Sequence, residues 1–248
     1  MSDESDGSQL LSQLHLASFY ERKARLAPAV LAVLFGVPGA LVWGLEATNW
    51  IASLLGGAGI GIVVAIGLSH LASAMGNAYQ ERLWPRWPYD SPTNLRLKPG
   101  NEVVSEQQRL QWCNALHRMT GLELCSETTD EDELERTIKD AVAAGRAMLW
   151  ELPDKSRLSV HNADYGFARN FAGMRAIWIV LAAGSAIACW IALFLEKTSY
   201  FWPVASTLLL ILAIYLAIFR LSHYVRRRAD YYAESFFSAI VDAVKESG

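Results

Sequence analysis

The chain has 248 residues, of which 52% are hydrophobic and 19% are charged, and its formal net charge is −3. So large an apolar fraction, with a mean hydropathy above zero, is typical of a membrane protein with a sizeable soluble part. The slightly negative charge disfavours nucleic acid as a direct partner, because binding phosphates requires a basic surface.

Residues 1–25 are predicted to form a cytoplasmic amphipathic segment. The first nine residues are acidic and polar. They lack the basic region and the small-residue cleavage site of a signal peptide, so no signal peptide is expected. From Ser8 onwards, apolar residues at helical spacing lead into a basic cluster of Arg22, Lys23 and Arg25.

Four apolar runs are long enough to cross a bilayer, since roughly 20 apolar helical residues span a hydrocarbon core about 30 Å thick. The runs are residues 26–45, 50–75, 176–195 and 201–219. The residues that link the two members of each pair are too few to form a domain, so we expect two membrane hairpins, 26–75 and 174–219. Pro28 falls in the first turn of its run, where a missing N–H is harmless, whereas Pro38 is expected to kink the helix.

The second run carries a ridge of small residues. Every fourth position along it is small, at Ser53, Gly57, Gly61, Ala65 and Ser69. In lipid no hydrophobic force pulls apolar helices together, so close backbone approach over small residues is a main route to association. The ridge therefore predicts tight packing against another helix. The alternative is that glycine and alanine are simply common in membrane helices.

The basic residues are distributed unequally between the two sides of the predicted membrane plan. One side carries Arg22, Lys23, Arg25, Arg82, Arg86, Arg169, Arg175, Arg220, Arg226, Arg227 and Arg228. The two short loops on the other side carry only Lys197. Because Lys and Arg are retained in the cytoplasm, we expect a multi-pass protein of a bacterial inner membrane with both termini cytoplasmic.

Between the hairpins lies a predicted cytoplasmic insert, residues 76–173. Ser105 opens a capping box and Gly121 supplies a stop, so a helix is expected over residues 105–120. A second capping box at residues 128–131 starts another predicted helix.

This second helix of the insert is expected to end near Gly145. Its predicted buried stripe consists of Leu134, Ile138, Ala141 and Val142. Residues 122–125 and 147–152 fit either short strands or loops, which leaves both an α and an α+β insert open.

Two further segments adjoin the insert and the last span. Residues 83–89 are rich in aromatic residues and proline and cannot form a regular helix. Their aromatic side chains are expected either at the lipid headgroups or packed on the insert itself: Trp84, Trp87 and Tyr89. Residues 220–248 are predicted to continue the fourth run as a cytoplasmic helix. Its apolar stripe must be buried on the insert or on a neighbouring subunit: Tyr232, Phe236, Ile240 and Val244.

The sequence contains no recognisable catalytic or cofactor motif: it lacks a phosphate-binding glycine loop, a His-Glu-x-x-His and a Gly-x-Ser-x-Gly. Cys113, His117 and Cys125 provide too few ligands for structural zinc, and nothing is placed to orient the histidine for nucleophilic catalysis. The acidic run at residues 130–135 is interpreted as a solvated helix start. We therefore expect no enzyme activity, no cofactor and no metal. The three cysteines, with Cys189, indicate a reducing compartment or simple packing.

The segment with the most varied chemistry precedes the third run. Its candidate ligand or coupling residues are His161, Asn162, Tyr165, Arg169 and Asn170. A segment that couples the insert to the membrane would need such a mixture of polar, aromatic and basic groups. The alternative is an ordinary helix entry, with Arg169 and Arg175 as headgroup anchors.

The hairpin–insert–hairpin layout resembles small four-helix membrane components of bacterial antiphage defence systems. The resemblance implies a cytoplasmic domain that senses an infection signal, often a nucleotide messenger, and spanning helices that disturb the membrane in response. It supplies no site residue, because it concerns the layout alone.

We therefore expect an α-helical polytopic membrane protein, with four transmembrane helices as two hairpins flanking a small cytoplasmic α or α+β insert. The runs lack charged residues in their central turns, which disfavours secondary transport. We expect a self-associating effector that alters the membrane on a signal, and alternatively a non-conducting scaffold that recruits a cytoplasmic protein. The expected partners are the lipid bilayer, further copies of the chain and a cytoplasmic protein or small-molecule signal such as a nucleotide.

Overall fold

The computed structural model describes residues 19–43, 58–124, 130–152 and 156–246. Within these ranges the regular structure is entirely helical. The described residues of the insert therefore contain no strand, which favours the α over the α+β alternative. The chain divides into two compact units, unit 1 (residues 1–79 and 166–225) and unit 2 (residues 80–165 and 226–248).

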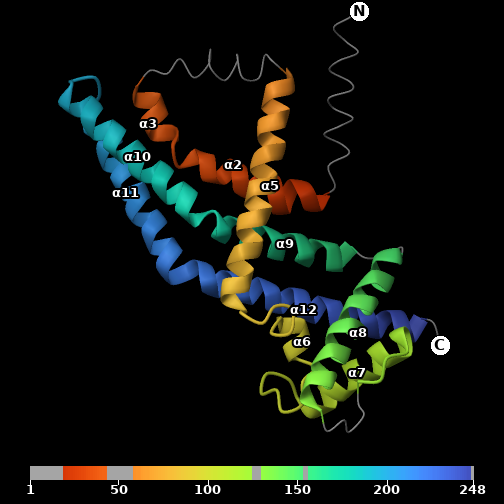
Figure 1. Cartoon of the computed structure of the whole chain (residues 1–248). Helices are drawn as coiled ribbons and strands as arrows, with labels where there is room; N and C mark the ends of the chain where they lie inside the picture. Colours follow the sequence, from red (N-terminus) through yellow and green to blue (C-terminus); the bar gives the residue numbers. More distant parts are fainter. Residues whose placement is uncertain (1–18, 44–57, 125–129, 153–155, 247–248) are drawn as a thin grey trace, which may run out of the picture. The chain divides into compact units, whose positions relative to one another are not determined.

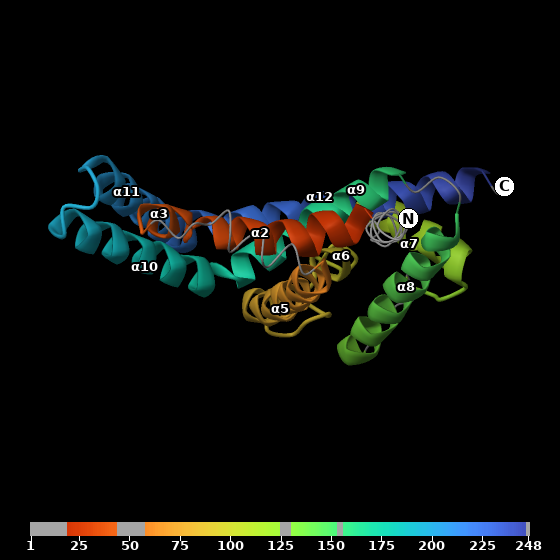
Figure 2. The ribbon, with the colours of Figure 1, turned by 90° about the horizontal axis from the view of Figure 1, so that it is seen from above.

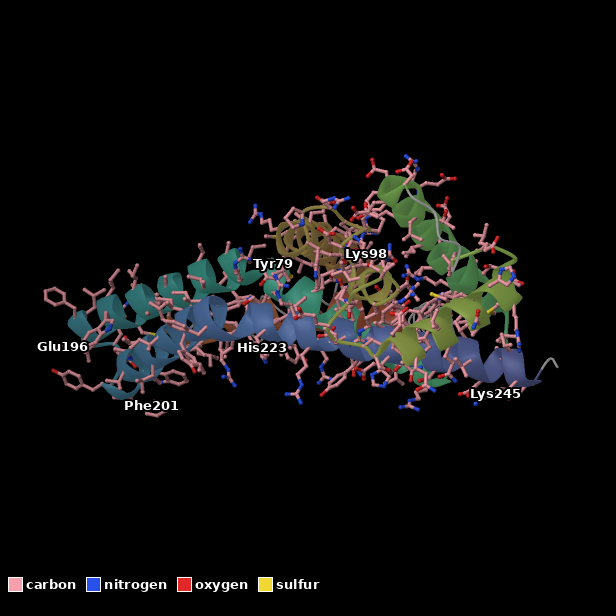
Figure 3. All side chains as sticks on the ribbon, turned by 90° about the horizontal axis from the view of Figure 1, so that it is seen from below. Tyr79, Lys98, Glu196, Phe201, His223 and Lys245 are labelled. Atoms are coloured by element: carbon pink, nitrogen blue, oxygen red, sulfur yellow. The ribbon has the colours of Figure 1, made fainter. Side chains whose placement is uncertain are left out.

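Unit 1 is built from apolar helices (Figure 1). Its elements are the π-helical turn η1 (Glu21–Leu26), α2 (Ala27–Leu34), α3 (Val37–Val42), most of α5 (Ala58–Leu83), the end of α9 (Ser156–Gly173), α10 (Arg175–Phe194), α11 (Phe201–Tyr215), a second π-helical turn η2 (Leu216–Arg220) and the start of α12 (Leu221–Glu246). Helices α10 and α11 form a hairpin and lie side by side in both ribbon views (Figures 1 and 2). The turn that joins them lies between Glu196 and Phe201 (Figure 3).

Two helical stretches in the described part of the chain are long and apolar enough to cross a membrane. One is α10, with 20 residues, and the other is the continuous stretch Phe201–Glu246, whose apolar part precedes Arg220. The third and fourth predicted runs are thus confirmed as helices of spanning length and composition. The chain continues in helix beyond Arg220, as the absence of a breaker predicted.

The first predicted run is broken into two helices. Pro28 lies in the first turn of α2, and Pro38 lies in the first turn of α3, with Phe35 and Gly36 between the two helices. The interruption at Phe35 and Gly36 lies just before Pro38, where the sequence predicted a kink. Each of the two helices is too short to cross a bilayer by itself, so the described residues do not form the single spanning helix that the run predicted.

The second predicted run, residues 50–75, lies partly outside the described residues. From Ala58 onwards it belongs to α5. This helix continues to Leu83, past the predicted end of the run, and the chain then leaves regular helix as residues 83–89 predicted.

Unit 2 contains α6 (Pro92–Leu95), α7 (Glu106–Thr120), α8 (Glu131–Glu151), the first part of α9 and most of α12. The predicted limits of α7 are confirmed. The hydroxyl of Ser105 accepts a hydrogen bond from the Gln108 N–H at 3.2 Å, and Gly121 ends the helix with a left-handed φ of 76°. A glycine is favoured there because this backbone conformation strains other residues.

Helix α8 differs from its prediction at both ends. Asp130 caps it by accepting the Asp132 N–H at 3.0 Å, and the helix passes through Gly145 to Glu151. The short strand considered for residues 147–152 is therefore wrong. Gly145 therefore does not terminate the helix. Its lack of a side chain instead leaves room for Leu116, since an added Cβ would lie 2.8 Å from the Leu116 side chain.

The apolar stripe of α12 forms the core of unit 2. Phe236 and Ile240 are fully buried, and the ring of Phe237 stacks on Trp112 of α7 with centroids 4.2 Å apart. The stripe is thus covered by the insert, one of the two alternatives that the sequence left open.

In the aromatic segment 83–89, Trp84 is buried, with its ring centroid 6.0 Å from that of Trp87.

Candidate functional site

Asn170, one of the predicted coupling residues, is a buried polar side chain of unit 1. It is fully buried in α9. Its amide nitrogen donates a hydrogen bond to the Ala24 carbonyl of η1 at 2.6 Å. Its amide oxygen accepts one from Arg169 Nε at 3.2 Å. The bond to Ala24 ties α9 to η1, because leaving the buried amide group of Asn170 unpaired is costly.

Helices α5 and α9 cross beside Asn170 with their backbones in contact. A Cβ added to Gly76 of α5 would lie 2.9 Å from the Asn170 Cα, and one added to Gly173 would lie 2.5 Å from the carbonyl carbon of Met75. Only glycine permits such an approach. We call these residues, Gly76, Asn170 and Gly173 together with Ala24, the crossing cluster.

Gly166 extends the same close packing along α9. A Cβ there would lie 2.7 Å from the Ala24 Cβ and 3.0 Å from the Tyr20 hydroxyl. Sequence reasoning selected Asn170 but missed these glycines. The signal was present, because Gly166, Asn170 and Gly173 follow one another at spacings of four and three residues, on one face of a helix.

The predicted small-residue ridge on the second run stays a prediction. Ser53 and Gly57 lie outside the described residues, and Gly61 and Ala65 are described only as helical backbone of α5. The hydroxyl of Ser69 donates to the Ile66 carbonyl of its own helix at 2.8 Å.

The other predicted coupling residues belong to unit 2. The Tyr165 hydroxyl donates to Gln80 Oε1 at 2.7 Å, in a buried hydrogen bond. The ring of His161 lies 6.4 Å from that of Tyr231, and its Nδ1 is buried without a hydrogen-bond partner in the described part of the chain. Asn162 is half-buried. A ligand role for these residues stays a prediction.

A buried carboxylate that sequence reasoning overlooked, Glu135, forms ion pairs with two basic residues of unit 2. Glu135 accepts a hydrogen bond from Lys98 Nζ at 2.5 Å and pairs with Arg86. The Lys98 hydrogen bond is the main cause that lowers the pKa of Glu135, and Arg86 acts in the same direction. Glu135 belongs to the acidic run that was interpreted as a solvated helix start, so that interpretation fails for this residue.

The sulfhydryl of Cys113 is enclosed in the core, whereas His117 is exposed and hydrogen-bonds through Nδ1 to the Leu122 carbonyl at 3.1 Å. Cys125 lies outside the described residues. Among the residues that the structure describes, no three His, Cys, Asp or Glu side chains are grouped to hold a metal ion.

Neither a protein-family model, nor a curated protein, nor a solved structure matches the chain.

Proposed function

We propose that the chain is a self-associating membrane protein whose insert, residues 76–173, controls a change in the membrane. The observation that carries the proposal is the outward apolar surface of the α10–α11 hairpin. Val180 and Phe194 on α10 are 68% and 88% exposed, and Phe201 on α11 is 68% exposed. Large apolar side chains exposed along a helical hairpin suit a lipid environment better than water.

The broken helix α2–α3 supports a deeper involvement in the membrane than a simple anchor. The Gly39 N–H, next to the break, donates to the Ser185 hydroxyl of α10 at 2.7 Å. At membrane depth a broken helix is tolerated only where protein groups satisfy the freed backbone. Broken helices of this kind are typical of channels and transporters, in which the backbone beside the break lines a cavity.

In this proposal the four apolar runs cross the bacterial inner membrane, and the termini and the insert are cytoplasmic, on the distribution of basic residues. A single copy offers few helices and no charged group in the central turns of α10 or α11. A water path would therefore require several copies, with the ridge from Ser53 to Ser69 as the predicted contact. A role as an effector in antiphage defence would fit the layout that the chain resembles.

Ion leakage tests the proposal. The chain is expressed in bacteria carrying a membrane-potential dye, alongside Ser185→Leu and Gly184→Leu variants. Ser185 pairs with Gly39, whereas a Cβ added at Gly184 meets nothing within 4 Å. We expect depolarisation with the wild type and with Gly184→Leu, and its loss with Ser185→Leu at equal membrane levels. A wild type that inserts but never depolarises the membrane would refute the effector proposal and favour the non-conducting scaffold.

A further inference from the structure

Unit 2 contains an open pocket of about 170 Å³ whose polar wall carries two arginines. Arg96 follows α6 and Arg226 belongs to α12, and Asn101 and Asp230 complete the polar lining. Pro92, Leu95 and Val103 form an apolar wall. Two guanidinium groups in one pocket are the arrangement that proteins use for oxyanions with several acceptor oxygens.

Arg226 is held in place, and no carboxylate of the described residues forms an ion pair with it, although Asp230 is near enough to interact with its charge. Its guanidinium lies over the Trp84 ring, 5.6 Å from the ring centroid. One N–H group donates to the Leu83 carbonyl at 3.2 Å, which engages one of the five donors of the side chain. A stacked guanidinium keeps a defined orientation.

Arg96 is buried, and it donates to two partly exposed carboxylates and, at 3.2 Å, to the main-chain carbonyl of Asp230. It donates to Asp230 Oδ1 at 3.3 Å and to Glu234 Oε1 at 3.2 Å. Well-formed hydrogen bonds between charged groups are shorter, at about 2.7–2.9 Å. An incoming oxyanion would therefore compete with long contacts rather than with optimal ones.

We propose that this pocket binds a phosphate ester, with the phosphate group on Arg96 and Arg226 and the carbon-bearing part against Pro92, Leu95 and Val103. The volume is below the roughly 300–1,000 Å³ of typical small-molecule sites, which selects a group of headgroup size. Two sources supply this chemistry: the glycerophosphate headgroup of an anionic lipid and a small soluble phosphate ester. The proposal goes beyond the proposed function and does not depend on it, because the pocket lies wholly within unit 2.

Asp230 sets the affinity of the pocket. Its carboxylate would repel a phosphate that shares Arg96, so removing its charge is expected to favour binding. Burial raises the pKa of Asp230, against the opposing effect of Arg96, so this carboxyl gives up its charge more readily than an ordinary aspartate. Asp230→Asn keeps the shape of the side chain and an oxygen that accepts from Arg96.

The test is titration calorimetry on the full chain in a neutral maltoside detergent. The probes are glycerol 3-phosphate, dihexanoyl phosphatidylglycerol and, as a lipid without net charge, dihexanoyl phosphatidylcholine. We expect Arg226→Gln to weaken binding about tenfold or more, as the loss of a charged hydrogen bond implies. Arg227→Gln is the matched control, because its Nε bonds the Tyr231 hydroxyl and it does not line the pocket. It should change the affinity less than about twofold, and Asp230→Asn should increase it.

Binding of glycerol 3-phosphate would identify a soluble ester as sufficient, and binding of phosphatidylglycerol alone would identify a lipid headgroup. Either result supports the phosphate site if Arg226→Gln and Arg227→Gln differ as stated. Equal losses of affinity in the two variants would mean that only surface charge attracts the probes, and this would overturn the proposal. The absence of saturable binding of either anionic probe would overturn it as well. Circular dichroism of each variant establishes that the helices are intact.

Discussion

Replacing Gly173 with alanine should destabilise unit 1 strongly for so small a change. The added Cβ would lie 2.5 Å from the carbonyl carbon and oxygen of Met75 and 2.6 Å from the Gly76 nitrogen. All three atoms are backbone atoms, so no side chain can rotate away. Relief requires α5 and α9 to separate by about 1 Å, since ordinary carbon contacts lie at about 3.5–4.0 Å.

The magnitude follows from the same contact. Overpacking a well-packed core costs about 1–3 kcal/mol, and the rigid backbone at Gly173 places this substitution at the upper end. The gain in helix propensity on replacing glycine by alanine offsets up to about 1 kcal/mol. A net loss of about 2 kcal/mol remains. For a chain of this size, it corresponds to a fall in melting temperature of about 4–8 °C.

The assay is thermal unfolding of the full chain in a neutral detergent, followed by circular dichroism. Gly184→Ala is the matched control, because a Cβ there meets nothing within 4 Å. It makes the same chemical change in a helix and should leave the melting temperature unchanged or slightly raised. If Gly173→Ala and Gly184→Ala melted together, α5 and α9 would not be in backbone contact, and the crossing cluster would be refuted.

Three further substitutions test other parts of the account. Asn170→Leu leaves the Ala24 carbonyl without its donor and should cost about 1–3 kcal/mol in the same melting assay; an unchanged melting temperature would contradict the hydrogen bond. Glu135 has a lowered pKa because Lys98 hydrogen-bonds its charged form. Its stabilisation is therefore present above its ordinary pKa of about 4.3 and is lost as the pH falls below it. Acid titration of helicity should show a Glu135→Gln variant that is less stable than the wild type at pH 7 and approaches it in acid. A constant difference would contradict the ion pair. Phe237→Ala removes a fully buried ring and should cost about 3–5 kcal/mol in denaturant unfolding, whereas a loss below about 1 kcal/mol would place the α12 stripe outside the core.

Local signals in the sequence predicted the helices of unit 2 well. Ser105 and Gly121 set the limits of α7 because capping and left-handed termination depend on neighbouring residues alone. The same logic failed at Gly145. Its role depends on Leu116, which is distant in sequence, and no local pattern distinguishes a packing glycine from a terminating one.

Long-range pairings explain the remaining differences at the candidate sites. The mixed chemistry around Asn170 distinguishes it in the sequence, but its hydrogen-bond partner Ala24 is 146 residues away and cannot be inferred from local spacing. Glu135 belongs to an acidic run that is typical of a solvated helix start, but it is buried and forms ion pairs with Arg86 and Lys98. The pocket of Arg96 and Arg226 likewise joins residues from the two separate sequence segments of unit 2, so spacing along the chain does not reveal it.

The central claim, that the α10–α11 hairpin crosses a membrane and leaves the insert on the cytoplasmic side, is tested most directly by cysteine labelling in intact spheroplasts. A cysteine-free background carries either Ser199→Cys, in the turn of the hairpin, or Gln107→Cys, exposed on α7. A membrane-impermeant maleimide should label the cysteine at position 199 from outside and the cysteine at position 107 only after the cells are opened. Labelling of position 107 in intact spheroplasts, or protection of position 199, would contradict the account.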